Sequence, residues 1–124
     1  MVLADTSVWV DHLRVGHTGL EALLNEGYVI THPFVIGELA CGGLKNRAEI
    51  LSLLKSLPAS ATAKHQEVLE LIETRKLMNR GVGYVDVNLL ASVLLSGSLL
   101  WTLDKKLDEL AEELDVRFDD KKSR

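Results

Sequence analysis

The sequence lacks most of the features that mark a protein for a special environment. It has a single cysteine, Cys41, so an internal disulfide is impossible, which agrees with a reducing compartment. It has no apolar run of about 18 residues, so we predict no membrane span. Its first residues lack the basic and long apolar regions of a signal peptide. We therefore expect a soluble, cytoplasmic protein.

Internal repeats, low-complexity tracts and an excess of basic residues are also missing. The 14 basic and 18 acidic residues give a net charge of -4, which argues weakly against binding nucleic acid by charge alone. What the chain does have is 124 residues, 47% of them hydrophobic, enough for one domain with its own core. We predict a single domain over 1–118 and a disordered charged tail over 119–124.

Short apolar segments alternate with helical patterns along the chain. We expect strands at 2–4, 28–31, 99–102 and 116–118, with a weaker candidate at 61–63. Helical spacing and helix-ending glycine or proline residues predict helices at 7–14, 20–26, 34–41, 47–57, 65–80, 85–95 and 107–114. This alternation is typical of an α/β fold with three layers, in which helices cover both faces of a parallel sheet.

Four acidic residues fall where such a sheet binds ligands, beyond the carboxyl ends of its strands. Asp5 follows the first strand, and Asp104 follows the strand at 99–102. Glu38 and Asp86 lie early in the helices that begin near 34 and 85. We expect all four carboxyl groups to lie at one end of the sheet.

Helix capping is the simplest alternative role for two of these acids. Aspartate is a common N-cap, and an acid near a helix N-terminus gains about 0.3–1 kcal/mol from the helix dipole. Taken alone, Asp5 or Asp104 is more often a cap than a ligand. Ser7 and Thr102, however, already offer caps for the same two helices, which leaves the carboxylates available.

Capping explains the other two acids less well. Glu38 lies within the apolar stretch PFVIGELA, and Asp86 is the only charged residue between positions 80 and 104. A buried carboxylate without a partner is strongly unfavourable, and clustered carboxylates raise one another's pKa. A hard divalent cation with oxygen ligands, Mg²⁺ or Mn²⁺, would relieve both problems. The predicted metal-binding and catalytic residues are Asp5, Glu38, Asp86 and Asp104, supported by the hydroxyl groups of Thr6, Ser7 and Thr102.

Metal ions held in this way suit phosphodiester chemistry. Two divalent ions about 3.5–4 Å apart can activate water and stabilise the attacking and leaving oxygens. Setting the four acids aside leaves 14 acidic against 14 basic residues, so the acidic balance no longer argues against RNA or DNA. The candidate phosphate contacts are Lys45, Arg47, Lys105 and Lys106, although each taken singly is more often ordinary surface.

The remaining polar residues carry weaker signals. The four histidines lack metal-ligand spacing, so we assign neither a zinc site nor a histidine base. Asn88, Ser92 and Ser96 form a polar stripe on the helix at 85–95, which could face the site, face a partner, or bond to neighbouring backbone. We expect Cys41 to be a small core residue.

Four segments carry a resemblance to a known family. They are LADTSVWVD at the start, VIGELACG around Glu38, GVGYVDVNLLASVLLSG around Asp86 and LLWTLDKKLDELAEEL around Asp104. In this order they resemble the PIN-domain family, and more narrowly the VapC-type toxins of toxin–antitoxin pairs. The resemblance covers nearly the whole chain, and the ordered set is more specific than any single motif.

The resemblance implies a PIN domain with a five-stranded parallel sheet in the order 3-2-1-4-5. It implies a Mg²⁺- or Mn²⁺-dependent endoribonuclease whose four acids correspond to Asp5, Glu38, Asp86 and Asp104. It also implies an RNA substrate, a homodimer, and a cognate VapB-type antitoxin whose tail reaches the acidic site. The segment at 61–63 is a poor match for the third strand.

Three other functions compete with this interpretation. A phospho-signalling receiver-like domain needs an aspartate after the third strand, but no acid lies between positions 51 and 64. A phosphatase of the haloacid dehalogenase type needs Asp-x-Asp after the first strand, where this chain has Ser7. A catalytically silent PIN-fold binding module would be favoured if one of the four acids were missing, and all are present.

Overall fold

The computed structural model describes residues 1–120, which form seven helices and three short strands. In chain order the elements are β1 (Val2–Ala4), α1 (Thr6–Val15), α2 (Thr18–Glu26), β2 (Val29–Ile30), α3 (Pro33–Ala40), α4 (Arg47–Ser56), α5 (His65–Arg75), α6 (Tyr84–Ser96), β3 (Leu99–Trp101) and α7 (Lys105–Glu113). Local signals set several of these bounds. Pro33 is the first residue of α3, where its missing N–H costs nothing, and the left-handed Gly27 and Gly97 end α2 and α6.

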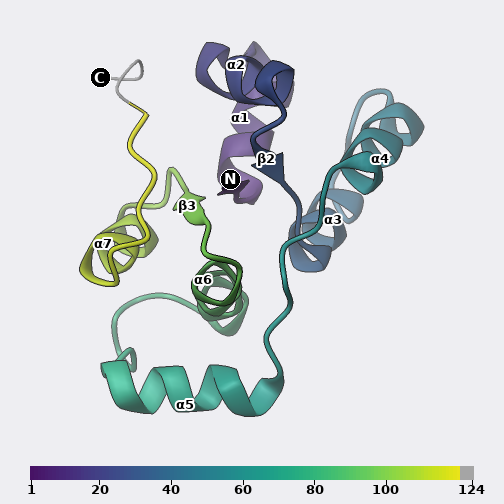
Figure 1. Ribbon diagram of the computed structural model, residues 1–124. Helices are drawn as coiled ribbons and strands as arrows, with labels where there is room; N and C mark the ends of the chain where they lie inside the picture. Colours follow the sequence, from purple (N-terminus) through teal and green to yellow (C-terminus); the bar gives the residue numbers. More distant parts are fainter. Residues whose placement is uncertain (121–124) are drawn as a thin grey trace.

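The three strands form one parallel sheet in the order β2-β1-β3. Val2 is in register with Val29 on one side and with Leu99 on the other. Helices α1 and α2 lie on one side of the sheet and α6 and α5 on the other, with α3 and α4 beyond β2 and α7 beyond β3 (Figure 1). This confirms the predicted α/β class with a parallel sheet.

The prediction of five strands was wrong, because each outer strand is reduced to a single bridge. Thr31 pairs with Ala59, and Leu100 pairs with Arg117, both in parallel. These bridges preserve the predicted lateral order around the three real strands. The segment at 61–63 leaves the sheet because the Ser96 hydroxyl of α6 accepts the Ala61 N–H at 3.0 Å. The preceding Pro58 also lacks the N–H that a longer ladder would need.

The helices agree with the predictions to within one or two residues, with α5 as the main exception. The sequence predicts a helix to residue 80, but α5 ends at Arg75, and Lys76 takes a left-handed conformation. The chain turns there so that Leu77 can enter the core. Cys41, expected in the core, is exposed at the end of α3.

The core lies between the sheet and its covering helices. Both tryptophans, Trp9 and Trp101, are buried in it, and residues 87–93 of α6 are all buried, as a helix apolar on every side requires. None of the helices formed by residues 1–120 is both long enough and apolar enough to span a membrane.

The end of the described chain folds back onto the domain. Arg117 Nη1 lies 3.7 Å from Asp119, and Asp120 lies 3.9 Å from His17 Nε2. The predicted charged tail begins at 119, and positions 121–124 of it lie outside the described residues.

Candidate functional site

Asp5 is the most deeply fixed of the four predicted acids. It follows β1 directly and caps α1, because its Oδ1 accepts the N–H groups of Ser7 at 3.0 Å and Val8 at 3.3 Å. The Ser7 hydroxyl also donates to Oδ1, and the Thr102 hydroxyl donates to Oδ2 at 2.5 Å. Burial raises the pKa of Asp5, and these hydrogen bonds act in the opposite direction.

Thr102 links Asp5 to the next acid. This buried residue follows β3, and its hydroxyl donates to Asp5 while accepting the Asp104 N–H at 3.0 Å. The Ser7 hydroxyl accepts the Leu103 N–H at 2.9 Å in the same way. The hydroxyl groups of Ser7 and Thr102 therefore connect the carboxyl ends of β1 and β3.

Asp104 stands at the start of α7. Its Oδ1 accepts the Leu107 N–H at 3.0 Å, so it is the N-cap of that helix. Its side chain is exposed, in contrast to that of Asp5. The expectation that Ser7 and Thr102 would cap α1 and α7 was therefore wrong. The aspartates are the caps, and the hydroxyl groups hold them.

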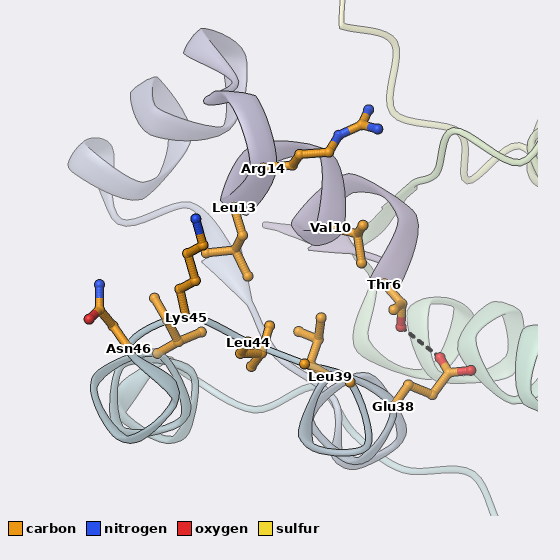
Figure 2. A pocket seen from close by; sticks show the side chains of 12 residues that line it. Thr6, Val10, Leu13, Arg14, Glu38, Leu39, Leu44, Lys45 and Asn46 are labelled. Atoms are coloured by element: carbon orange, nitrogen blue, oxygen red, sulfur yellow. Dashed lines mark hydrogen bonds between the residues drawn. The ribbon is translucent and has the colours of Figure 1, made fainter.

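Glu38 reaches the site from α3. Its Oε1 accepts the hydroxyl of Thr6, the residue after Asp5, at 2.6 Å (Figure 2). The Glu38 side chain is exposed, although it lies within an apolar stretch of sequence. This contact brings α3 to the N-terminal end of α1, and with it a third acid to the carboxyl edge of the sheet.

Asp86 lies in the first turn of α6, half-buried, and accepts the Gly83 N–H at 3.2 Å. Burial raises its pKa, the Gly83 hydrogen bond lowers it, and the negative charges of Asp104 and Glu38 raise it further. Asp86 is thus close enough to Asp104 and Glu38 to interact with their charges. No basic side chain is among the groups that shift its pKa.

The four acids therefore converge on one end of the sheet from four elements. Their donor chemistry, carboxylate and hydroxyl oxygen, fits a hard divalent cation. Within residues 1–120, however, no three acidic, histidine or cysteine side chains lie close enough together to hold a metal ion as they stand. Asp5 is fixed by its hydrogen bonds, so the exposed Glu38 and Asp104 side chains would have to turn toward it.

Sequence reasoning missed the part played by His32. This buried histidine caps α3, because its Nδ1 accepts the Phe34 N–H at 3.0 Å. Burial lowers its pKa, so the ring is neutral and its Nε2–H donates to the Ser92 hydroxyl at 2.9 Å. The pair locks α3 against α6, the helices that carry Glu38 and Asp86. The proline after His32 marks the cap position, but nothing in the sequence pairs it with Ser92.

The other two residues of the polar stripe bond to the backbone of α6, and Ser96 does so in addition to accepting the Ala61 N–H. Asn88 donates to the Tyr84 carbonyl at 2.9 Å, and Ser96 donates to the Ser92 carbonyl at 2.7 Å. Backbone bonding, one of the alternatives left open by the sequence, therefore accounts for two of the three residues.

The basic residues predicted as phosphate contacts have different surroundings in the structure. Arg47 donates to the Ala40 carbonyl at 2.8 Å and so closes the C-terminal end of α3. Lys106 lies against Gly81, where an added Cβ would come within 2.4 Å of its Cδ. Lys45 lines a pocket beside Glu38.

That pocket has a volume of about 620 Å³. It lies between α1, α3 and the start of α4, with Glu38 and Thr6 at one end and Lys45 and Asn46 at the other (Figure 2). Its apolar lining residues are Val10, Leu13, Leu39, Leu44 and Ile50. The acidic site thus opens onto an elongated, mostly apolar groove.

The sequence profile of the PIN domain matches residues 2–113, which includes all four acids. The chain belongs to the PIN-domain family. The match to the PIN domain excludes a receiver-like domain. The two outer strands, reduced to single bridges, are a local departure from the expected five-stranded sheet. Two curated relatives are both named Ribonuclease VapC32, from Mycobacterium tuberculosis strains CDC 1551 / Oshkosh and ATCC 25618 / H37Rv. Each is 46% identical to this chain over 117 residues, covering 94% of either sequence. The similarity supports a PIN domain of the VapC type.

Proposed function

We propose that this chain is a Mg²⁺- or Mn²⁺-dependent endoribonuclease, the toxin of a VapBC-type toxin–antitoxin pair. The observation that carries the proposal is the convergence of Asp5, Glu38, Asp86 and Asp104 at the carboxyl edge of the sheet. The relatives named as ribonucleases support the same chemistry. The mutual charge at Asp86 supports a site that requires a cation to be stable when ionised.

The proposed ligands differ in how firmly the structure holds their side chains. Asp5 presents its carboxylate in one orientation, because helix N–H groups hold Oδ1 and Thr102 holds Oδ2. Glu38 and Asp104 are exposed and can adjust to a ligand. A divalent cation held by Asp5, Glu38, Asp86 and Asp104 would supply positive charge for the phosphate and would lower the pKa of a water molecule. Water would then be the nucleophile, so none of these side chains has to attack phosphorus.

We infer that the groove beside Glu38 receives a segment of the cognate antitoxin. An apolar peptide would cover the lining of the groove, and a basic side chain at its end would meet Glu38 and its neighbours. Val10→Asp, at an exposed position of this lining, should weaken antitoxin binding while RNA cleavage by the isolated chain persists. The family resemblance also leads us to expect a homodimer, which light scattering after size exclusion would measure.

Cleavage of total cellular RNA by the purified chain tests the proposed activity. We expect discrete fragments with Mn²⁺ or Mg²⁺, and none with chelator or with Asp5→Asn. The asparagine retains an oxygen for the Ser7 and Val8 N–H groups, so the fold should persist. Asp11→Asn, which removes an acid paired with Arg14 on the surface of α1, is the matched control and should remain active. Cleavage that survives Asp5→Asn would refute the proposal.

A further inference from the structure

A pair of exposed rings lies at the N-terminal ends of α5 and α6. His65 and Tyr84 are the first residues of α5 and α6, and the His65 Nδ1 lies 2.6 Å from the Tyr84 hydroxyl oxygen. The ring centroids are 5.5 Å apart, with the planes inclined at 55°. The hydrogen bond therefore fixes the tyrosine ring in place without burying it, since 43% of Tyr84 remains exposed.

The position of Tyr84 relative to the acids is set by the first turn of α6. Asp86 follows two residues later, and its carboxylate is bound by the N–H of Gly83, the residue before Tyr84. The negative charges of Asp104 and Glu38 in turn raise the pKa of Asp86. Tyr84 thus begins the same first turn of α6 that carries Asp86, while its ring turns toward His65 at the start of α5.

Exposure alone does not single out this ring. Tyr28 is 49% exposed, but it precedes β2 and so lies at the opposite, amino edge of the parallel sheet. Phe34 is also exposed at the start of α3, but its ring partner is the buried His32. Among the exposed aromatic residues at 1–120, Tyr84 alone shares a helical turn with one of the four acids and has an exposed partner ring that orients it.

We propose that Tyr84, oriented by His65, stacks on a base of the single-stranded RNA that passes through the acidic site. This inference rests on the proposed nuclease function. Every base presents an aromatic face, so stacking holds a strand beside the acids whatever its sequence. The remaining edge of the imidazole is available to a polar group of the same nucleotide. The ring would position the strand, while the acids act on the phosphate.

Binding and crosslinking measurements test this proposal apart from cleavage. The probe is a fluorescein-labelled, random-sequence single-stranded RNA about 12 nucleotides long. The protein is the full chain carrying Asp5→Asn, in Mn²⁺, so that the probe is not cut. By fluorescence anisotropy, Tyr84→Ala should weaken binding about tenfold, in the range of one lost base stack. Tyr84→Phe should restore most of the affinity, and His65→Gln should give an intermediate loss.

Tyr28→Ala is the matched control, because it removes an equally exposed tyrosine from the other edge of the sheet, and it should bind like the parent. A second probe carries 5-iodouridine, which crosslinks to stacked aromatic rings on irradiation. Peptide mapping should place the adduct on Tyr84 and not on Tyr28. A merely structural tyrosine would give no such adduct.

The outcomes separate the two claims. If no variant, including the parent, binds the RNA, the proposed function and this inference both fail. If Tyr84→Ala binds as well as the parent and the adduct maps elsewhere, the inference alone fails. A variant that changes oligomeric state but not RNA affinity would assign the ring to contact between copies of the chain, and would also overturn the inference.

Discussion

Asp104 is both the N-cap of α7 and one of the proposed metal ligands, and two substitutions separate these roles. Asp104→Ala removes the acceptor of the Leu107 N–H, whereas Asp104→Asn retains it. We expect both variants to lose RNA cleavage. We expect only the alanine variant to lose stability, because asparagine caps a helix about as well as aspartate.

The size of the effect follows from the contacts. Loss of an N-cap costs about 1 kcal/mol. Loss of the charge at the helix N-terminus costs roughly 0.3–1 kcal/mol in both variants. Relief of the repulsion with Asp86 offsets part of that loss, because the negative charge of Asp104 raises the pKa of Asp86. The asparagine variant should therefore be about as stable as the parent, and the alanine variant about 1 kcal/mol less stable.

Urea denaturation and thermal melting without metal would measure these differences. For a domain of this size, 1 kcal/mol corresponds to a shift of about 4 °C in Tm. If Asp104→Asn lowered Tm as much as Asp104→Ala, the charge and not the cap would stabilise α7. If Asp104→Asn cleaved RNA normally, Asp104 would be a cap only.

Three further perturbations follow from the same structure. Thr102→Val leaves the buried Asp5 carboxylate short of a donor, and should cost about 1–3 kcal/mol in urea denaturation, whereas Thr102→Ser should cost less than half of that. Gly81→Ala places a side chain at φ 81° and should lower the unfolding free energy by about 1–2 kcal/mol. Gly43→Ala is the control, because nothing lies within 4 Å of the new Cβ, and it should change the unfolding free energy by less than about 0.5 kcal/mol. Burial lowers the pKa of His32, so the contribution of this residue to stability is complete above its unfolded pKa of about 6.5 and is lost as pH falls through its folded pKa. His32→Asn should therefore flatten this part of the curve of unfolding free energy against pH. An unchanged curve would contradict the role assigned to His32.

The sequence predicted the arrangement of the sheet better than the length of its strands. Period and turn residues located β1, β2 and β3, because buried parallel strands are short apolar runs between helices. The prediction of the outer strands was wrong because each of them pairs through a single bridge. On one side, the hydrogen bond from the Ala61 N–H to Ser96 contributes to ending the pairing. A side chain far away in sequence makes that contact, so no local pattern shows it.

The same limit applies to the candidate site. The positions of Asp5 and Asp104 after strands were visible in the sequence, and so was the anomaly of Asp86 in an apolar segment. Which group caps each helix was not visible, since aspartate and its neighbouring hydroxyl residue are both good caps. The contact of Thr6 with Glu38 depends on how α1 meets α3, which only the folded chain determines.

We propose that the four carboxylates, which come from four elements, act as one cation site. Calorimetric titration of Mn²⁺ into the purified full chain tests it most directly, with Asp5→Asn beside the parent and Asp11→Asn as control. We expect saturable binding by the parent and the control, and binding weakened at least about tenfold in Asp5→Asn, because a ligand of the divalent ion is lost. Equal Mn²⁺ affinity in all three proteins, or none in the parent, would contradict it.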